Sequence, residues 1–302
     1  MANEHLGKIK FELKLKDSLV IGHFRAMANP CVIFIEHQDT SSVQTVMHHM
    51  AEEVWRIEQK YSRYLESSAL SKINTGTGQS VSIDAETYHL LKLSDVLYEE
   101  SQGMFDISSG IFRKIWSFDQ QQQIPTQSQV DELLDYVGWN KIRFDEQSIS
   151  LPVGMQIDFG GIGKEYAADR CAALVPEELG ASVLVNLGGD VVVKGPRADD
   201  SSWQIGIEDK SGGGKVWKQV PLSRGAIATS GDVYKSIVFE GKRYGHIINA
   251  LTGFPVADAP NTVTVAAPNC TEAGMLTTLA ILQGKNAEHF LQEQERPYWV
   301  QR

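Results

Sequence analysis

The hydrophobic period of this 302-residue chain changes near residue 142. Before that point apolar residues recur every three or four positions, a spacing that predicts amphipathic helices. After it, short apolar runs are separated by turn residues, a pattern typical of strands. Helices first, and then many strands with few helices between them, favour an α+β fold over a doubly wound sheet.

The same periodicity places the individual elements. We predict helices over 43–61, with Ser41 and Gln44 as a capping box, and over 84–103, 130–136, 164–174 and 271–283. We predict strands over 31–35, 142–144, 148–151, 155–158, 183–187, 191–193, 203–207, 226–229 and 262–265. The glutamine run at 120–123 is expected to be a surface loop. Because there is no internal repeat and no clear linker, we expect a single unit over residues 1–302.

Composition narrows the classes of partner and compartment. The chain has 38 acidic and 28 basic side chains, a net charge of −10, so it offers no overall basic face for nucleic acid or an anionic membrane. Its three cysteines lie far apart, which argues against a disulfide framework or a zinc knuckle. There is no apolar run of membrane-spanning length. We therefore expect a cytoplasmic protein.

The segment from Ile157 to Tyr166 is the strongest candidate for ligand binding. It combines a predicted strand, three glycines in four positions and a helix that begins with Lys164. Glycines let a backbone approach a ligand closely, and free N–H groups at a helix start favour an anion. A cation in the first turn opposes the helix dipole, so an anionic ligand would explain Lys164. A tight turn with a solvated lysine is the alternative.

Three further segments carry candidate groups. His246 has an unperturbed pKa near neutrality and suits a general acid or base, the alternative being a packed structural histidine. Asp106 and Asp190 each follow an apolar run beside glycines. Such aspartates suit ligand hydroxyls or a metal, and they suit turns equally well.

Taken together and in this order, these segments resemble the ApbE family of FAD:protein FMN transferases. The resemblance covers nearly the whole chain and rests on residues 25–27, 61–64, 68–74, 105–106, 158–164, 186–190, 228–232, 246–255 and 273–284. It implies an ApbE-like, T-fold-like architecture of antiparallel sheets with packed helices. It also implies an enzyme that splits the pyrophosphate of FAD, releases AMP and passes FMN to a threonine or serine hydroxyl in the flavinylation motif of an acceptor flavoprotein.

The resemblance also assigns residues by motif position. The FAD site would be lined by Met27, Tyr64, Met104, Phe105, Asp106, Asp158, Lys164 and Ile248. Lys164 and His246 would be catalytic. Mg²⁺ would be held by the backbone carbonyl of Gly161 and the hydroxyl of Thr278, hard oxygen ligands of the kind that this ion prefers.

The chain departs from the family pattern at the metal site. The family places an aspartate four residues before the threonine, one turn along the same helix face, and Gly274 stands there in this chain. Glu272 lies two residues earlier, roughly 200° around a helix, so it cannot substitute in a regular helix. Asn249 and Ala250 also stand where the family usually has Asp-Pro.

Two functional hypotheses follow from this departure. In the first, the chain is an active Mg²⁺-dependent transferase in which water or another carboxylate completes the metal shell. In the second, it is an FAD-binding relative with weak or no transferase activity. On the sequence alone, we expect Gly274→Asp to raise magnesium affinity. A glycine inside a helix costs about 1 kcal/mol relative to alanine, and the sequence offers no structural reason for it.

Overall fold

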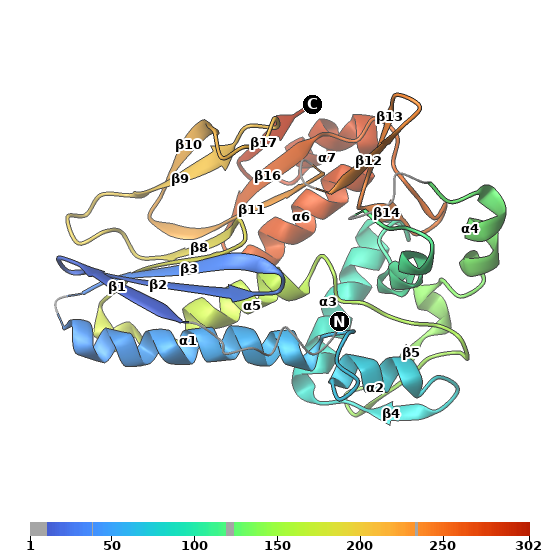
Figure 1. Cartoon of the computed structure of the whole chain (residues 1–302), viewed down its shortest axis with the longest axis horizontal. Helices are drawn as coiled ribbons and strands as arrows, with labels where there is room; N and C mark the ends of the chain where they lie inside the picture. Colours follow the sequence, from blue (N-terminus) through green and yellow to red (C-terminus); the bar gives the residue numbers. More distant parts are fainter. Residues whose placement is uncertain (1–10, 38, 119–123, 233–234) are drawn as a thin grey trace.

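An eight-stranded antiparallel sheet forms the centre of the computed structural model, which describes residues 11–37, 39–118, 124–232 and 235–302 (Figure 1). Neighbouring strands follow the order β1-β2-β3-β7-β8-β11-β16-β17. These strands are β1 (Glu12–Lys16), β2 (Leu19–Ala26), β3 (Asn29–Glu36), β7 (Ser182–Leu187), β8 (Asp190–Lys194), β11 (Arg224–Gly231), β16 (Thr262–Ala267) and β17 (Tyr298–Gln301). The two halves of the sheet meet where β3 pairs with β7, so residues 37–181 are inserted between adjacent strands.

Three helices cover one face of this sheet: α1 (Thr40–Lys60), α5 (Gly163–Ala173) and α6 (Cys270–Leu282). α1 packs on β2, α5 on β7 and β8, and α6 on β11 and β16. Period-2 alternation explains the burial, because successive strand residues point to opposite faces. Val183 and Val185 belong to the core under the helices, whereas Leu184 belongs to the core on the other face.

The other face is covered by a hairpin of two strands, β9 (Trp203–Glu208) and β10 (Val216–Leu222), which lies above the sheet in Figure 1. Trp203, Ile205 and Ile207 alternate with exposed or half-buried residues and pack against Leu184 and Ile227. The sheet is therefore buried on both faces by different kinds of element.

Most of the remaining elements lie beyond one end of the large sheet, on the right in Figure 1, opposite the end at which the inserted segment leaves β3. The helices are α2 (Ala69–Thr75), α3 (Ala85–Glu100), α4 (Gln127–Leu134) and α7 (Ala287–Glu293), with short 3-10 helices η1 (Ile107–Lys114), η2 (Trp139–Lys141), η3 (Glu177–Leu179) and η4 (Gly284–Asn286). The small sheets consist of β4 (Ser80–Ser82), β6 (Ser148–Ser150) and β5 (Arg143–Phe144), of β12 (Ser236–Phe239) with β13 (Lys242–Gly245), and of β14 (Ile248–Asn249) with β15 (Phe254–Pro255). The expected α+β architecture of antiparallel sheets with packed helices is confirmed.

Two local predictions were wrong. The first helix is capped by Asp39 and not by Ser41, because the Asp39 carboxylate accepts hydrogen bonds from the backbone N–H groups of Ser41 and Ser42. The predicted strand over 155–158 does not form. Instead the Asn74 side chain bonds both the N–H and the carbonyl of Ile157, at 2.8 and 2.9 Å, and so takes the place of a neighbouring strand.

The other predicted elements are present, with ends shifted by a few residues. The helix expected to run to Gly103 ends at Glu100, and Leu174 caps α5 as an exposed residue. The predicted loop over 120–123 falls on residues 119–123, which lie outside the described residues.

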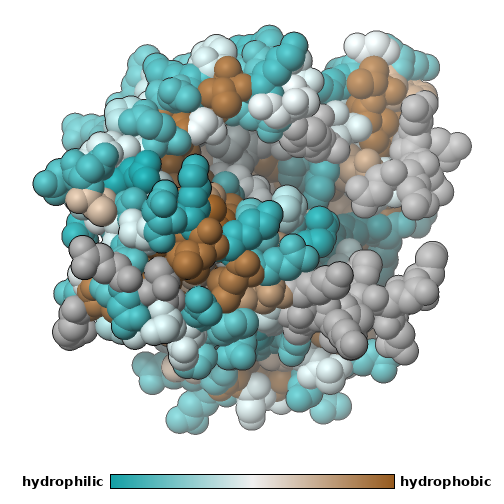
Figure 2. Space-filling view, turned by 60° about the vertical axis from the view of Figure 1, so that its left-hand side comes forward, coloured by the Kyte–Doolittle hydropathy of each residue, from teal (hydrophilic) through white to brown (hydrophobic). Residues whose placement is uncertain are grey.

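The surface adds two observations. Across the described residues, no helix has both the length and the apolar character that a membrane span requires. On the face shown in Figure 2, hydrophobic residues form patches bordered by hydrophilic ones.

Candidate functional site

Two turns and the end of a strand meet at one end of the large sheet. The β2–β3 turn contains Met27 and Ala28 in the left-handed region, and the β7–β8 turn contains Gly188 and Gly189. The N–H of Gly188 donates to the Pro30 carbonyl at 3.2 Å, which joins the two turns. A side chain at Gly188 would lie 2.6 Å from the Cβ of Asn29, so this contact requires glycine. The last residues of β11 lie at the same end, because the Thr229 backbone hydrogen-bonds to Asp190.

Lys164 reaches this end of the sheet from the first turn of α5. Its Nζ lies 2.5 Å from Oδ2 of Asp190 and 3.5 Å from the carbonyl of Gly188. The structure thus supplies a different anion from the one expected: the carboxylate of Asp190 accounts for a lysine at a helix start. Burial acts to lower the pKa of Lys164, but the Asp190 and Glu165 carboxylates outweigh it and the pKa is raised.

Glu165 is the residue that sequence reasoning missed. It is 7% exposed, and among the described residues its Oε2 atom has no hydrogen-bond partner. Burial raises the pKa of Glu165, and repulsion from Asp190 raises it further. The signal was present in the sequence, because Glu165 shares a helix stripe with Ala168 and Ala172, which are both buried.

The structure explains why residue 274 is a glycine. A Cβ placed there would lie 2.4 Å from Cγ and 3.2 Å from Oε1 of Glu165. The absence of a side chain on α6 therefore makes room for the Glu165 side chain from α5. The same geometry bears on the expectation that Gly274→Asp alone would raise magnesium affinity, because an aspartate can enter only if the Glu165 side chain shifts; that expectation stays a prediction.

The two predicted metal ligands come together. The ideal Cβ position of Gly161 lies 4.0 Å from the Thr278 hydroxyl and 3.4 Å from the ring of Phe105. Thr278 is buried, and its hydroxyl lies 3.3 Å from that of Ser230 at the end of β11. Ser230 was not singled out from the sequence, although it belongs to the small polar residues that follow the apolar part of this strand.

Asp158 lies in a cluster of charged groups. Its carboxylate accepts a hydrogen bond from Arg63 and lies 3.5 Å from Nε of Arg113. Tyr64, predicted to line the FAD site, is 72% exposed, and its hydroxyl accepts a hydrogen bond from Arg63 at 2.8 Å. Two guanidinium groups thus face one carboxylate, which leaves a net positive charge, and the two arginines were not assigned from the sequence.

Asp106 has a structural task in this fold. Its buried carboxylate accepts hydrogen bonds from the N–H groups of Ser108 at 2.8 Å and of Trp139 at 2.6 Å, so it caps η1. Burial raises the pKa of Asp106. The neighbouring residue Met104 accepts a hydrogen bond from the N–H of Ala250 at 2.9 Å, which brings Met104 beside the β14 strand that contains Ile248.

His246 is half-buried, but its Nδ1 atom is buried and has no hydrogen-bond partner within the described part of the chain. Burial lowers its pKa to about 4, and the positive charges of Lys235 and Lys164 act in the same direction. The imidazole is therefore neutral near pH 7. A neutral imidazole can accept a proton, so its charge state is compatible with a general base.

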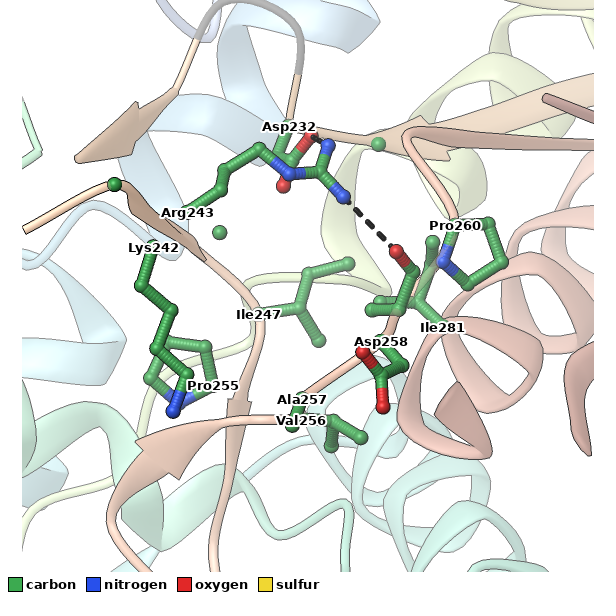
Figure 3. Close-up of a pocket in the computed structure, with 14 residues that line it drawn as sticks. Asp232, Lys242, Arg243, Ile247, Pro255, Val256, Ala257, Asp258, Pro260 and Ile281 are labelled. Atoms are coloured by element: carbon green, nitrogen blue, oxygen red, sulfur yellow. Dashed lines mark hydrogen bonds and ion pairs between the residues drawn. The ribbon is translucent and has the colours of Figure 1, made fainter. Parts of the chain in front are cut away.

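A separate cavity of about 240 Å³ lies beside the end of β11 (Figure 3). Arg243 bonds the Asp232 carboxylate and the Ala259 carbonyl, the latter at 2.9 Å, and closes one side of the cavity. Ile247 and Pro255 line it, but the residues predicted for FAD do not. The site built from the two turns and Lys164 is thus lined by other residues than this cavity.

Comparisons with known proteins identify the family. The sequence model of the ApbE family matches residues 27–299. The chain belongs to the ApbE family. It is 29% identical over 262 residues to the FAD:protein FMN transferase of Treponema pallidum (79% of this chain, 72% of the relative). It is 27% identical over 269 residues to that of Haemophilus influenzae (83% and 78%).

Solved structures give the same result for the fold. The crystal structure of the ApbE protein from Thermotoga maritima matches with a TM-score of 0.84 at 28% identity, over 96% of this chain and 94% of that one. The flavin transferase ApbE from Vibrio cholerae matches with a TM-score of 0.79 at 23% identity, over 96% and 94%. This member of the ApbE family therefore has the expected fold along nearly its whole length.

Proposed function

We propose that this protein is an FAD:protein FMN transferase, which cleaves the pyrophosphate of FAD and transfers FMN to a threonine or serine hydroxyl of an acceptor flavoprotein. The observation that carries the proposal is the convergence of Gly161, Lys164 and Thr278 at one end of the sheet, in a chain whose named relatives have this activity. We further propose that it acts as a single unit in the cytoplasm, without nucleic acid or membrane as partners.

The charges of the site suit a dinucleotide. Lys164 has three N–H donors, of which Asp190 and the Gly188 carbonyl use two. The third is available to a phosphate oxygen, where a fixed cation stabilises the charge that develops during phosphoryl transfer. Arg63 and Arg113 add positive charge beside Asp158.

Apolar side chains would hold the ring systems. Met27, Met104, Phe105 and Ile248 lie partly or fully buried around the same turns, where flat aromatic rings can pack on them. Tyr64 is exposed and offers a ring face beside Arg63. In this proposal Asp106 acts through the η1 turn that it caps, and Asp158 through its two arginines.

His246 would serve as the base. A neutral imidazole takes the proton of the acceptor hydroxyl while the oxygen of that hydroxyl forms a bond to the FMN phosphorus. The bond from that phosphorus to the bridging oxygen breaks, and AMP leaves with the electron pair. The low pKa of His246 keeps the imidazole neutral, and therefore able to accept a proton, above about pH 4, although the same low pKa makes it a weak base.

The residues present fit a magnesium ion. Gly161 and Thr278, which lie close to one another, offer a backbone carbonyl and a hydroxyl, and Oε2 of Glu165 is a buried oxygen that lacks a hydrogen-bond donor among the described residues. In the same part of the chain no three His, Cys, Asp or Glu side chains gather around one point, so the ligands would be mixed oxygen donors. When bound, the ion would neutralise the phosphates of FAD.

The alternative is an FAD-binding relative with weak or no transferase activity. The observation that favours it is Gly274, where the family pattern has the charged metal ligand. Both proposals require FAD binding, and they differ in whether AMP is released.

The test is an incubation of the protein with FAD and Mg²⁺, with and without an acceptor domain that carries an Asp-x-x-Ser/Thr-Gly-Ala-Thr segment. We expect AMP release and covalent flavin fluorescence on the acceptor, and loss of both in Lys164→Met. Bound FAD without AMP or labelling would contradict the transferase and support the alternative. An acceptor whose Ser/Thr is replaced by alanine is the matched control for the site of labelling.

A further inference from the structure

The group formed by Lys164, Glu165 and Asp190 has an unbalanced charge. Glu165 and Asp190 are both more than nine-tenths buried, and Lys164 is the cation that contacts Asp190. Two ionised carboxylates and one ammonium group would leave one negative charge inside the protein, which is costly without a further partner. Among the described residues, Oε2 of Glu165 and Oδ2 of Asp190 both lack a hydrogen-bond donor, and the two side chains interact with each other, so a further cation or proton would complete the group.

The position of the Glu165 carboxylate is set by Gly274. The Glu165 side chain from α5 occupies the volume that a side chain at 274 on α6 would take, with Cγ and Oε1 at 2.4 and 3.2 Å from the ideal Cβ position. Thr278 lies four residues further along α6, on the same helix face. The Glu165 carboxylate therefore lies beside the position that a side chain at 274 would take, and position 274 is one turn before Thr278 on the same helix.

We propose that Glu165 is the charged ligand of the divalent cation, delivered from α5 through the space that Gly274 leaves open, together with Thr278 and the Gly161 carbonyl. This inference rests on the proposed function. The cation is Mg²⁺ or another divalent ion that prefers hard oxygen ligands. Glu165 and Gly274 then form an interdependent pair, in which the carboxylate has moved from one helix to the other.

A shared proton is the competing explanation. A proton held between the carboxylates of Glu165 and Asp190 would also remove the excess charge. The two explanations differ in their consequence for metal binding, because a protonated carboxyl is a poor ligand whose replacement by an amide would leave metal affinity unchanged.

The experiment measures Mn²⁺ binding to the full chain, with and without FAD, from the electron paramagnetic resonance signal of free Mn²⁺, with Mg²⁺ as competitor. We expect Glu165→Gln to weaken Mn²⁺ binding by about tenfold or more. The matched control is Glu272→Gln, the same chemical change on α6 at a residue that pairs with Arg296 at 2.7 Å, and we expect it to bind as the unchanged protein does.

A swap of the carboxylate between helices makes the test independent of folding defects. Gly274→Asp alone should bind Mn²⁺ no better than the unchanged protein, whereas Gly274→Asp combined with Glu165→Ala should recover most of the affinity lost in Glu165→Ala. Unchanged Mn²⁺ affinity in Glu165→Gln, or no recovery in the swap, would overturn the inference.

Failure of the inference is distinguishable from failure of the proposed function. FAD binding is followed separately, by flavin fluorescence in metal-free buffer, and AMP release is followed with the unchanged protein. A protein that binds FAD and releases AMP, but whose Glu165→Gln variant binds Mn²⁺ normally, retains the function and loses only this assignment. A protein that does not bind FAD loses the proposed function itself.

Discussion

We predict that Gly274→Ala destabilises the protein, whereas a glycine-to-alanine change in a helix usually stabilises it. Replacing a helical glycine by alanine normally stabilises a protein by about 1 kcal/mol. At Gly274 the new methyl group would lie 2.4 Å from Cγ of Glu165, which is closer than real Cβ contacts allow, and 3.1 Å from Cδ, which is a tight contact. Cγ is near the backbone of α5, so the side chain cannot move away by rotating its far end.

The size of the effect of Gly274→Ala follows from two opposing contributions, the cost of overpacking and the gain in helix propensity. Overpacking in a closed interior costs about 1–3 kcal/mol, and we place this contact in the upper half of that range because it involves an atom near the helix backbone. After subtraction of the gain of about 1 kcal/mol in helix propensity, we expect Gly274→Ala to lower the free energy of unfolding by about 1–2 kcal/mol.

The assay is urea unfolding followed by circular dichroism and by tryptophan fluorescence, with a matched control. Gly163 is also helical, and a Cβ there would meet only the Phe159 Cβ at 3.9 Å, an ordinary contact. We expect Gly163→Ala to be neutral or stabilising. In a Glu165→Ala background the cost of Gly274→Ala should disappear, because the clashing atoms are gone. A stabilising Gly274→Ala, or an equal cost in both backgrounds, would refute the contact.

Three other predictions concern single groups. The pKa of His246 is about 4 in the folded state and near 6.5 when unfolded. The free energy of unfolding should therefore be highest above pH 6.5 and should fall by about 3 kcal/mol as the pH is lowered to 4. In His246→Gln, unfolding measured across this pH range should lack this decrease. Lys164→Met leaves the buried Asp190 carboxylate without its cation, and we expect unfolding at pH 7 to become easier by about 3 kcal/mol or more, measured by urea midpoint. Asp39→Ala should cost about 1 kcal/mol by thermal unfolding, while Gln44→Ala, which would break the capping box expected from the sequence, should cost nothing measurable.

The sequence predicted those features that depend on neighbours along the chain. The helices now labelled α1, α3 and α6 follow from apolar residues at helical spacing, and the central strands follow from short apolar runs between turns. The convergence of Gly161, Lys164 and the other motif residues was expected only because their order resembled a family. The placement of the metal ligands toward FAD stays a prediction.

Only the tertiary structure decided which side chains form hydrogen bonds and ion pairs with the motif residues. Side chains far apart in the sequence meet through packing and not through local preference. Asn74 takes the place of a strand beside Ile157, 83 residues away, and Arg63 bonds Asp158, 95 residues away. The chemistry of Lys164 depends on Asp190, which the β7–β8 turn carries to it. By itself the sequence determined that a glycine stands at 274, and the packing of α5 on α6 decided that this glycine makes room for Glu165, since shape complementarity between two helices has no signature in either one.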